Sequence, residues 1–209
     1  MTASHAIVLH QHGAVDDPGV LEPAVIDVPE PRAGQVCVRV RAVALNHLDL
    51  WVRRGLPGLK LTYPHRLGSD IVGEVDAVGE GVTHVAPGQR VVVAPGVSCG
   101  VCERCLGGED NLCPKYHILG ESTNGGYIER INVPAANMLP YPGELPFEEV
   151  AAVPLTFLTA WQMVVERAKV RPGELVLVQG AGSGVGVAAI QIARLHGARV
   201  WATAGSDAK

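Results

Sequence analysis

Apolar and polar side chains alternate along much of the first two thirds of the chain. The clearest stretch is Gln35 to Leu45, where valines alternate with Cys37, Arg39 and Arg41. A period of two with one polar face is typical of a half-buried strand. Further short apolar runs, bounded by Gly and Pro, lie at 6–9, 24–28, 71–78 and 91–94. Short strands at this spacing predict a compact β-barrel-like domain, interrupted by a short helix near Asn46 to Arg53.

The pattern changes to a helical period after residue 146. Apolar side chains from Phe147 to Ala168 recur at helical spacings, and Pro154 is expected to divide this stretch into two helices. A continuous apolar strand, an apolar helix and a second apolar strand then follow, at 174–179, 185–196 and 199–204. Strands of this kind are expected to be buried on both faces of a parallel sheet.

The two patterns predict a β-rich domain over residues 1–150 and the start of an α/β domain over residues 151–209. A single β-α-β unit leaves sheet faces and a sheet edge uncovered. We therefore expect the second domain to be incomplete and the sequence to be a fragment of a longer protein.

The composition narrows the classes of function. The chain has 209 residues, of which 47% are hydrophobic and 18% charged, so a sizeable buried core is expected and disorder is not. The formal net charge of −4 provides no basic surface for nucleic acid or for an anionic membrane. No apolar run approaches the roughly 20 residues that span a bilayer. Residues 1–9 lack the pattern of a signal peptide, so we expect a cytoplasmic protein.

Four of the five cysteines lie in one short window, and this clustering indicates a metal site. Their spacing is C-x2-C-x2-C-x7-C on a Gly-rich loop, where four thiolates can close around one tetrahedral zinc ion. Because the thiolates fill every coordination position, the predicted zinc is structural. Reduced thiols and an iron–sulfur cluster are the alternatives. The predicted ligands are Cys99, Cys102, Cys105 and Cys113, whereas Cys37 is expected to be a buried small hydrophobe.

A glycine-rich turn follows the strand at 174–179 and opens the next helix. Strand, turn, helix and second strand occur in the order of a dinucleotide-binding unit. Glycine lets the backbone approach a pyrophosphate, and the helix N-terminus offers free N–H groups to it. A tight turn without a ligand is the alternative. The predicted cofactor-binding residues of the turn are Gly182, Ser183, Gly184, Val185 and Gly186.

The end of the second strand bears on the choice between NAD and NADP. In NAD-binding proteins an acidic residue at this place binds the ribose 2′-hydroxyl. Here the strand ends in small residues, and Ser206 and Lys209 are candidates to contact a 2′-phosphate. The sequence therefore favours NADP, and Asp207 just beyond the strand leaves NAD as the alternative.

Together these features resemble the medium-chain dehydrogenase/reductase superfamily, which includes zinc alcohol dehydrogenases and quinone oxidoreductases. The resemblance extends from about Ala6 to the last residue and includes the four-cysteine lobe at 95–114. It implies a fold class of α/β plus β, with a GroES-like β-barrel domain followed by a truncated Rossmann nucleotide-binding domain. Members of the family continue well beyond this length, which agrees with an incomplete second domain.

The resemblance also implies where a catalytic zinc ion would bind. The family's three protein ligands correspond to Asn46, Ser69 and Leu155, and none of these is a credible zinc ligand. The hydroxyl of the alcohol dehydrogenase proton relay corresponds to Leu48 and is missing too. The Asn46-x-x-Asp49 segment resembles instead the zinc-free quinone oxidoreductases, which usually lack the four-cysteine lobe.

The leading functional prediction is NADPH-dependent reduction of a quinone or an α,β-unsaturated carbonyl without catalytic zinc. Such an acceptor takes hydride at carbon, and hydrogen-bond donors can stabilise the charge that spreads onto its oxygen. Asn46 and Ser69 are the candidate catalytic donors. The alternatives are that Asn46 caps the short helix and that Ser69 is a buried strand residue bonded to the backbone.

Two further residues enter through the resemblance alone. By family position, His47 is expected to reach the cofactor pyrophosphate and Thr159 to touch the nicotinamide. The alternatives are an ordinary surface histidine and a helix threonine that bonds back to a carbonyl.

Two other functions remain open: a zinc-type alcohol dehydrogenase, and a non-enzymatic nucleotide-binding or interaction protein. As partners we expect a small-molecule substrate, no nucleic acid and no membrane. The resemblance implies a homo-oligomer for the full-length protein.

Overall fold

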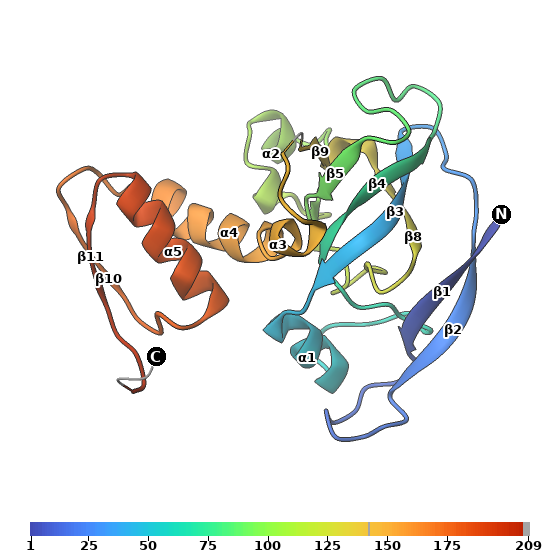
Figure 1. Cartoon of the computed structure of the whole chain (residues 1–209), viewed down its shortest axis with the longest axis horizontal. Coiled ribbons are helices and arrows are strands. Elements are labelled where there is room, and N and C mark those ends of the chain that lie inside the picture. Colours follow the sequence, from blue (N-terminus) through green and yellow to red (C-terminus); the bar gives the residue numbers. More distant parts are fainter. Residues whose placement is uncertain (142, 207–209) are drawn as a thin grey trace. The chain divides into compact units, whose positions relative to one another are not determined.

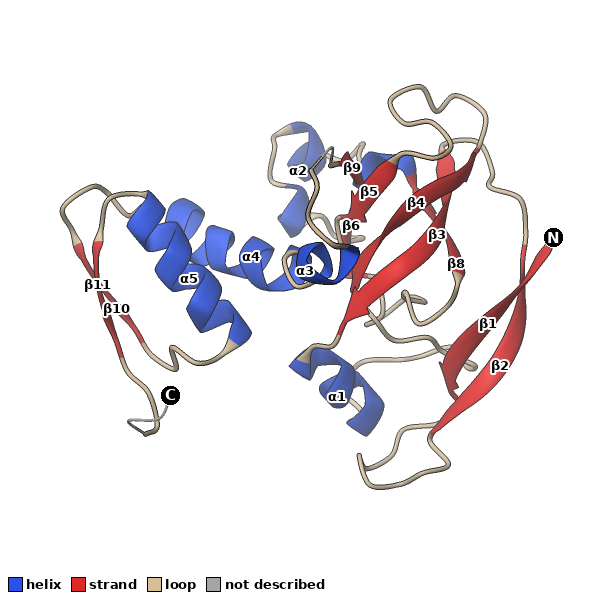
Figure 2. Ribbon diagram, in the orientation of Figure 1, coloured by secondary structure: helices blue, strands red, loops and turns tan. Residues whose placement is uncertain are grey.

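The computed structural model describes residues 1–141 and 143–206 of the chain. The fold divides into two units, Met1–Ala152 and Val153–Lys209. Most strands belong to the first unit, whereas the second unit combines helices with a short sheet (Figures 1 and 2). Within the described residues, no helix is both long enough and apolar enough to cross a membrane.

A five-stranded antiparallel sheet forms the centre of the first unit, in the order β8-β3-β4-β5-β9 (Figure 2). Its strands are β3 (Gln35–Ala44), β4 (Asp70–Val78), β5 (Arg90–Val93), β8 (Arg130–Pro134) and β9 (Met138–Pro140). The register of β3 against β4 shifts between Cys37 and Val38 and again between Val40 and Ala42. These irregularities break the strict alternation, so Val36, Cys37 and Val38 are all buried.

Two smaller antiparallel sheets complete the strands of this unit. One pairs β1 (Thr2–Leu9) with β2 (Leu21–Val28), and the other pairs β6 (Gly96–Val97) with β7 (His117–Ile118). Isolated bridges join β1 to Ile128 and His65. The predicted fold class is confirmed, but among the described residues the strands form open sheets and no closed barrel. The reason is that β1 meets the rest of the unit through isolated bridges rather than through a continuous ladder.

The core of the first unit is built from β-branched side chains of these sheets, which suit a pleated and half-buried surface. Fully buried members include Val8, Val36, Val38, Ile71, Val91 and Val93. Cys37 is 5% exposed and is a small buried residue, as predicted, and burial raises the pKa of its thiol.

Short helices surround the sheets of the first unit. They are α1 (His47–Arg54), α2 (Glu103–Leu106), η1 (Asp110–Leu112), η2 (Ala135–Asn137) and α3 (Phe147–Ala151). In α3, Val150 and Ala151 pack against Val72 of β4. Helix α1 confirms the predicted helix near Asn46, and Asn46 is its N-cap.

The second unit is a single β-α-β element preceded by helices. It contains α4 (Pro154–Trp161), the π-helical η3 (Gln162–Arg167), β10 (Leu175–Val178), α5 (Gly184–Leu195) and β11 (Arg199–Ala202). Pro154 stands in the first turn of α4 and divides it from α3, as predicted. Strands β10 and β11 are parallel neighbours, and α5 packs on them through Ala188, Ile192 and Ala193.

The prediction that both strands are buried on two faces is wrong. Leu175 and Leu177 of β10 are 46% and 56% exposed, and Trp201 of β11 is 65% exposed. In the described residues this sheet has only two strands, and a helix can cover only one of its faces. The strands are also shorter than expected, since Glu174, Gln179, Thr203 and Ala204 lie outside them.

Candidate functional site

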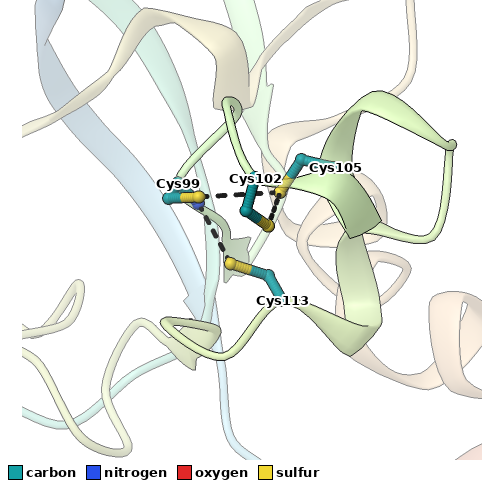
Figure 3. A group of neighbouring side chains, drawn as sticks. All are labelled: Cys99, Cys102, Cys105 and Cys113. Atoms are coloured by element: carbon teal, nitrogen blue, oxygen red, sulfur yellow. Dashed lines mark hydrogen bonds between the residues drawn. The ribbon is translucent and has the colours of Figure 1, made fainter.

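Four cysteine sulfurs converge on one point of the first unit (Figure 3). Cys99 follows β6, Cys102 is the N-cap of α2, Cys105 lies within α2, and Cys113 is the C-cap of η1. The four Sγ atoms all lie within 4.8 Å of one another. The fold thus brings together the four residues that the sequence nominated as metal ligands.

The spacing of these sulfurs fits a tetrahedral zinc ion. A Zn–S bond of about 2.3 Å places the four sulfurs of a tetrahedron about 3.8 Å apart. The Cys99 and Cys105 sulfurs are 3.9 Å apart, and those of Cys102 and Cys105 are 3.5 Å apart. The group can therefore hold a metal ion without large movement of its backbone.

The backbone around the cluster favours thiolates, which are the metal-binding form of cysteine. N–H groups of Val101 and Cys102 point at the Cys99 sulfur and lower the pKa of that thiol to about 6. The Cys113 sulfur accepts hydrogen bonds from the N–H groups of Lys115 at 3.3 Å and Cys99 at 3.5 Å. Hydrogen bonds to the charged form stabilise it, so the backbone prepares the Cys99 sulfur for a cation, whereas burial and the neighbouring sulfurs raise the pKa of the Cys102 thiol to about 11.

A second group of polar side chains lies where α1 begins. The amide Nδ2 of Asn46 donates to Oδ2 of Asp70 at 2.8 Å, and the Asn46 backbone N–H donates to Oδ2 of Asp49 at 2.7 Å. Oδ1 of Asp49 also accepts from the Gly68 N–H at 3.0 Å. Asp49 and Asp70 are 5% and 1% exposed. Asp49 thus anchors two loops, and Asp70 fixes the orientation of the Asn46 amide.

Ser69 lies beside Asp70 and is fully buried. Its hydroxyl finds no hydrogen-bond partner among the described residues, so the alternative of a serine bonded to the backbone is not supported. The preceding Gly68 has φ 93°, and a Cβ there would lie 2.5 Å from the Tyr127 ring. Burial, followed by the charge of Asp49, raises the pKa of the Tyr127 hydroxyl. Of the two candidate donors, Asn46 is half-buried and bonded to Asp70, and Ser69 is the fully buried residue that precedes Asp70.

The two residues that the family resemblance nominated lie in different units. His47 is exposed at the start of α1, with its ring 6.2 Å from that of Trp51. Thr159 donates its hydroxyl to the Leu155 carbonyl at 2.8 Å, which is the back-bond of an ordinary helix threonine. Their proposed contacts with a cofactor stay predictions.

The glycine-rich turn connects β10 to α5. Ser183 is the N-cap of α5: its Oγ accepts from the Gly186 N–H at 3.0 Å and donates to the Gly180 carbonyl at 2.9 Å. A Cβ at Gly186 would lie 2.4 Å from the Gly180 oxygen, and one at Gly184 would lie 2.9 Å from the Thr156 methyl. Glycine is required at both places for close packing of the turn. The first turn of α5 still presents N–H groups that a helix cannot bond internally, including that of Val185.

The residues nominated for the choice of cofactor lie beyond β11. Ser206 is exposed, in a bend after the strand. Lys209 and Asp207 lie outside the described residues. Gly182 leaves open space around its Cα, with nothing within 4 Å of a Cβ built there.

Sequence reasoning missed two members of the buried polar group. Asp70 was visible next to Ser69, but its bond to Asn46 depends on how β4 begins beside α1. Tyr127 is far from Gly68 in sequence, and no local pattern indicates that its ring covers that glycine. The burial of Tyr127 near the charge of Asp49 is a signal that only the folded chain provides.

Comparisons with known proteins agree on one family. Residues 32–143, just over half of the chain, match the model of the alcohol dehydrogenase GroES-like domain. The chain is 36% identical to acryloyl-coenzyme A reductase of Metallosphaera sedula over 87% of its own length and 54% of that protein. It is 33% identical to quinone oxidoreductase of Sus scrofa over 87% of its own length and 47% of that protein. The chain therefore spans about half the length of these curated relatives.

Comparison with solved structures leads to the same family. A crystal structure described as an NAD-dependent alcohol dehydrogenase has a TM-score of 0.93 and 60% sequence identity. It is matched over 98% of this chain and 59% of that one. Both described units of the chain are therefore represented in a known fold.

Proposed function

Because the chain belongs to the medium-chain dehydrogenase/reductase superfamily through its GroES-like domain, we propose that the whole protein transfers hydride from NADPH to a quinone or an α,β-unsaturated carbonyl without catalytic zinc. The observation that carries this proposal is the chemistry of Asn46 and Ser69. Asn46 is half-buried at the start of α1, Ser69 is fully buried just before β4, and neither is a zinc ligand of the usual kind.

The structural zinc site is a separate part of the proposal. The four sulfurs of Cys99, Cys102, Cys105 and Cys113 fit one zinc ion, and they leave no coordination position for a substrate. Zinc bound there would stabilise the loop and would not polarise a carbonyl.

Asn46 would act as a hydrogen-bond donor to the acceptor's oxygen. Its amide carries two hydrogens, and one of them is donated to Asp70. This bond holds the plane of the amide and leaves the second hydrogen for a substrate. Asp70 is therefore proposed as a positioning residue for Asn46.

Ser69 would be the second donor. A buried hydroxyl without a partner is rare in folded proteins, and a substrate oxygen would satisfy it. Since Ser69 is fully buried, the oxygen reaches it only when neighbouring side chains move. Together the two donors would stabilise negative charge on the oxygen while hydride adds at carbon.

The cofactor would bind at the N-terminus of α5. The turn of Gly182, Ser183, Gly184, Val185 and Gly186 would hold the pyrophosphate through backbone N–H groups. NADPH is proposed over NADH because small residues end β11, where NAD-binding proteins carry a carboxylate. For the whole protein we also propose assembly into a homo-oligomer.

A zinc-type alcohol dehydrogenase is the second candidate. The solved structure that is 60% identical to this chain is described as an NAD-dependent alcohol dehydrogenase, which favours both NAD and an alcohol substrate. The residues at 46 and 69 argue against it, since an amide and a hydroxyl are poor zinc ligands.

A steady-state assay of the whole protein distinguishes the two candidates. NADPH and NADH oxidation would be followed with 1,4-benzoquinone and with cyclohexenone, and NAD⁺ reduction with primary alcohols. The proposal expects NADPH-linked turnover of the first two acceptors that does not rise when zinc is added. Alcohol oxidation with NAD⁺ that increases with added zinc would establish the second candidate instead.

A further inference from the structure

A cavity of about 240 Å³ lies in the first unit, away from the cysteine cluster and from the polar group of Asn46. Its walls come from the end of β2 with the turn that follows, from the start of β3 at Gln35, from the loops at Arg66 and Asn124, and from the start of β8. Three guanidinium groups line it. The polar lining consists of Asp27, Arg32, Gln35, Arg66, Asn124, Arg130 and Asn132.

Arg66 is the central feature of this cavity. Its Nε is buried and has no hydrogen-bond partner among the described residues, and no ion pair to Arg66 is found in that part of the chain. Burial lowers the pKa of its guanidinium. Its backbone N–H donates to Oδ1 of Asn124 at 2.9 Å, which fixes the chain at this point. Arg66 as a whole is half-buried, and a partly desolvated cation without a counter-ion among the described residues is unfavourable, so an anion at this place would be stabilising.

The other side chains of the cavity add both donors and an acceptor. Arg32 provides a second cation without an ion pair among the described residues, whereas Arg130 already donates to Asp76 at 3.0 Å. Nδ2 of Asn132 donates to the Pro29 carbonyl at 2.8 Å, and this bond fixes the amide with Oδ1 buried and without a partner. The single carboxylate of the lining, Asp27, is exposed, so water screens its charge.

We infer that this cavity binds a phosphate group, which accepts hydrogen bonds from Arg66 and Arg32 while an O–H of the same ligand donates to Asn132. Guanidinium groups match the oxygens of a phosphate in geometry and charge. A phosphate monoester with a free hydroxyl, or inorganic phosphate in its protonated form, satisfies the buried Asn132 oxygen as well. A fully ionised dicarboxylate offers no such hydrogen.

Calorimetric titration of the protein with inorganic phosphate at pH 7.5 tests this inference. Sodium chloride keeps the ionic strength constant, and malonate and glycerol 3-phosphate are titrated in parallel. The expected order has both phosphates tighter than malonate. A tighter glycerol 3-phosphate indicates a monoester as the natural ligand, and a tighter inorganic phosphate indicates the free ion. Malonate binding as tightly as both phosphates would overturn the role given to Asn132.

Three variants locate the binding. Arg66→Met is expected to weaken phosphate binding by at least about tenfold, because a charge-assisted hydrogen bond is lost. Arg32→Met is expected to weaken it less, since this side chain is exposed. Arg41→Met is the matched control: it removes the same charge from a surface ion pair with Glu74, outside the cavity, and should leave the affinity unchanged.

Thermal unfolding gives a second readout. Phosphate should raise the Tm of the unsubstituted protein and of Arg41→Met by more than that of Arg66→Met, because a bound ligand adds to the general stabilising effect of phosphate, which all three proteins share. Without phosphate, Arg66→Met should be at least as stable as the unsubstituted protein, since it removes a half-buried charge that has no ion pair among the described residues. Phosphate binding that persists in Arg66→Met, at the glycine turn for example, would overturn the inference. If Arg66→Met does not fold, an unchanged affinity in Arg32→Met would do so.

Discussion

Two regions of the first unit, the cysteine lobe and the polar group at α1, differ in the atoms that they offer. The cysteine lobe brings four sulfurs within 4.8 Å of one another. The polar group at α1 offers instead the amide of Asn46 and the hydroxyl of Ser69, with Asp70 bonded to the amide. The first region suits a tetrahedral metal ion, and the second suits a substrate oxygen.

This difference separates a structural role from the proposed catalytic one. A metal in the lobe would stabilise a loop that has little core of its own, since α2 and η1 contain no buried residue. The region at α1 needs no such support, because Asp49 joins its loops through two backbone N–H groups. A chain can therefore keep a structural metal while its reaction site relies on hydrogen bonds.

The largest expected effect comes from removing a sulfur from the lobe. Cys113→Ala should abolish zinc binding and unfold residues 99–113, because structural zinc contributes about 10 kcal/mol or more to such sites. Elemental analysis and thermal unfolding measure the two consequences. Cys37→Ala is the matched control, as it removes a buried thiol outside the lobe and should leave the zinc content unchanged. Full zinc content in Cys113→Ala would show that the lobe is not the metal site.

Asn46 provides the sharpest test of the other region. Asn46→Ser keeps a good N-cap for α1 but removes the amide that Asp70 orients. We expect kcat of the whole protein to fall about 100-fold, the usual loss for one oxyanion donor, with little change in KM. Asn46→Ala should have the same effect on kcat. Restoration of activity by Ser but not by Ala would mean that Asn46 only caps the helix.

In the glycine turn, we expect a substitution at Gly186 to lower stability and a substitution at Gly182 to weaken cofactor binding. Gly186→Ala should lower the free energy of unfolding by about 1–3 kcal/mol, because its Cβ would meet the Gly180 carbonyl oxygen at 2.4 Å. Gly182→Ala has open space and should leave stability nearly unchanged while weakening NADPH binding. Urea denaturation and fluorescence titration with NADPH measure these effects. Equal destabilisation by both substitutions would contradict this division.

The smallest effect concerns pH. His65 is 2% exposed, and burial lowers the pKa of its imidazole. Near pH 6.5 the His65 imidazole becomes protonated in the unfolded chain but stays neutral in the folded chain. The contribution of His65 to the free energy of unfolding is therefore complete above pH 6.5 and is lost as the pH falls below it. The slope is at most about 1.4 kcal/mol per pH unit.

Urea denaturation between pH 7.5 and pH 5 measures this slope, and His65→Gln is the comparison. The lobe is identical in the two proteins, so acid release of its metal cancels in the difference. An equal pH dependence in both proteins would show that His65 does not titrate in this range.

The sequence predicted the lobe better than the reaction site for a physical reason. Its four cysteines lie in one short window, so their spacing alone limits where the sulfurs can go. The polar group at α1 joins Asn46, Asp70 and Tyr127, which meet only after β4 pairs and folds beside α1. The cavity around Arg66 is likewise built from stretches that are distant in the sequence, and it has no sequence signature.

In the second unit, the sequence predicted the order of the elements but not the exposure of the two strands. Its strand–turn–helix–strand order and the division at Pro154 could be predicted from local patterns. The exposure of Leu177 and Trp201 could not, because apolar strands are buried only when further strands and helices cover them.

The central claim is that this chain keeps a structural zinc and lacks a catalytic one. Elemental analysis of the purified protein after mild chelation measures zinc per chain directly. The account predicts a value close to one. A value close to two would contradict it, because a second tightly held zinc would require ligands at or near Asn46 and Ser69 that the account denies.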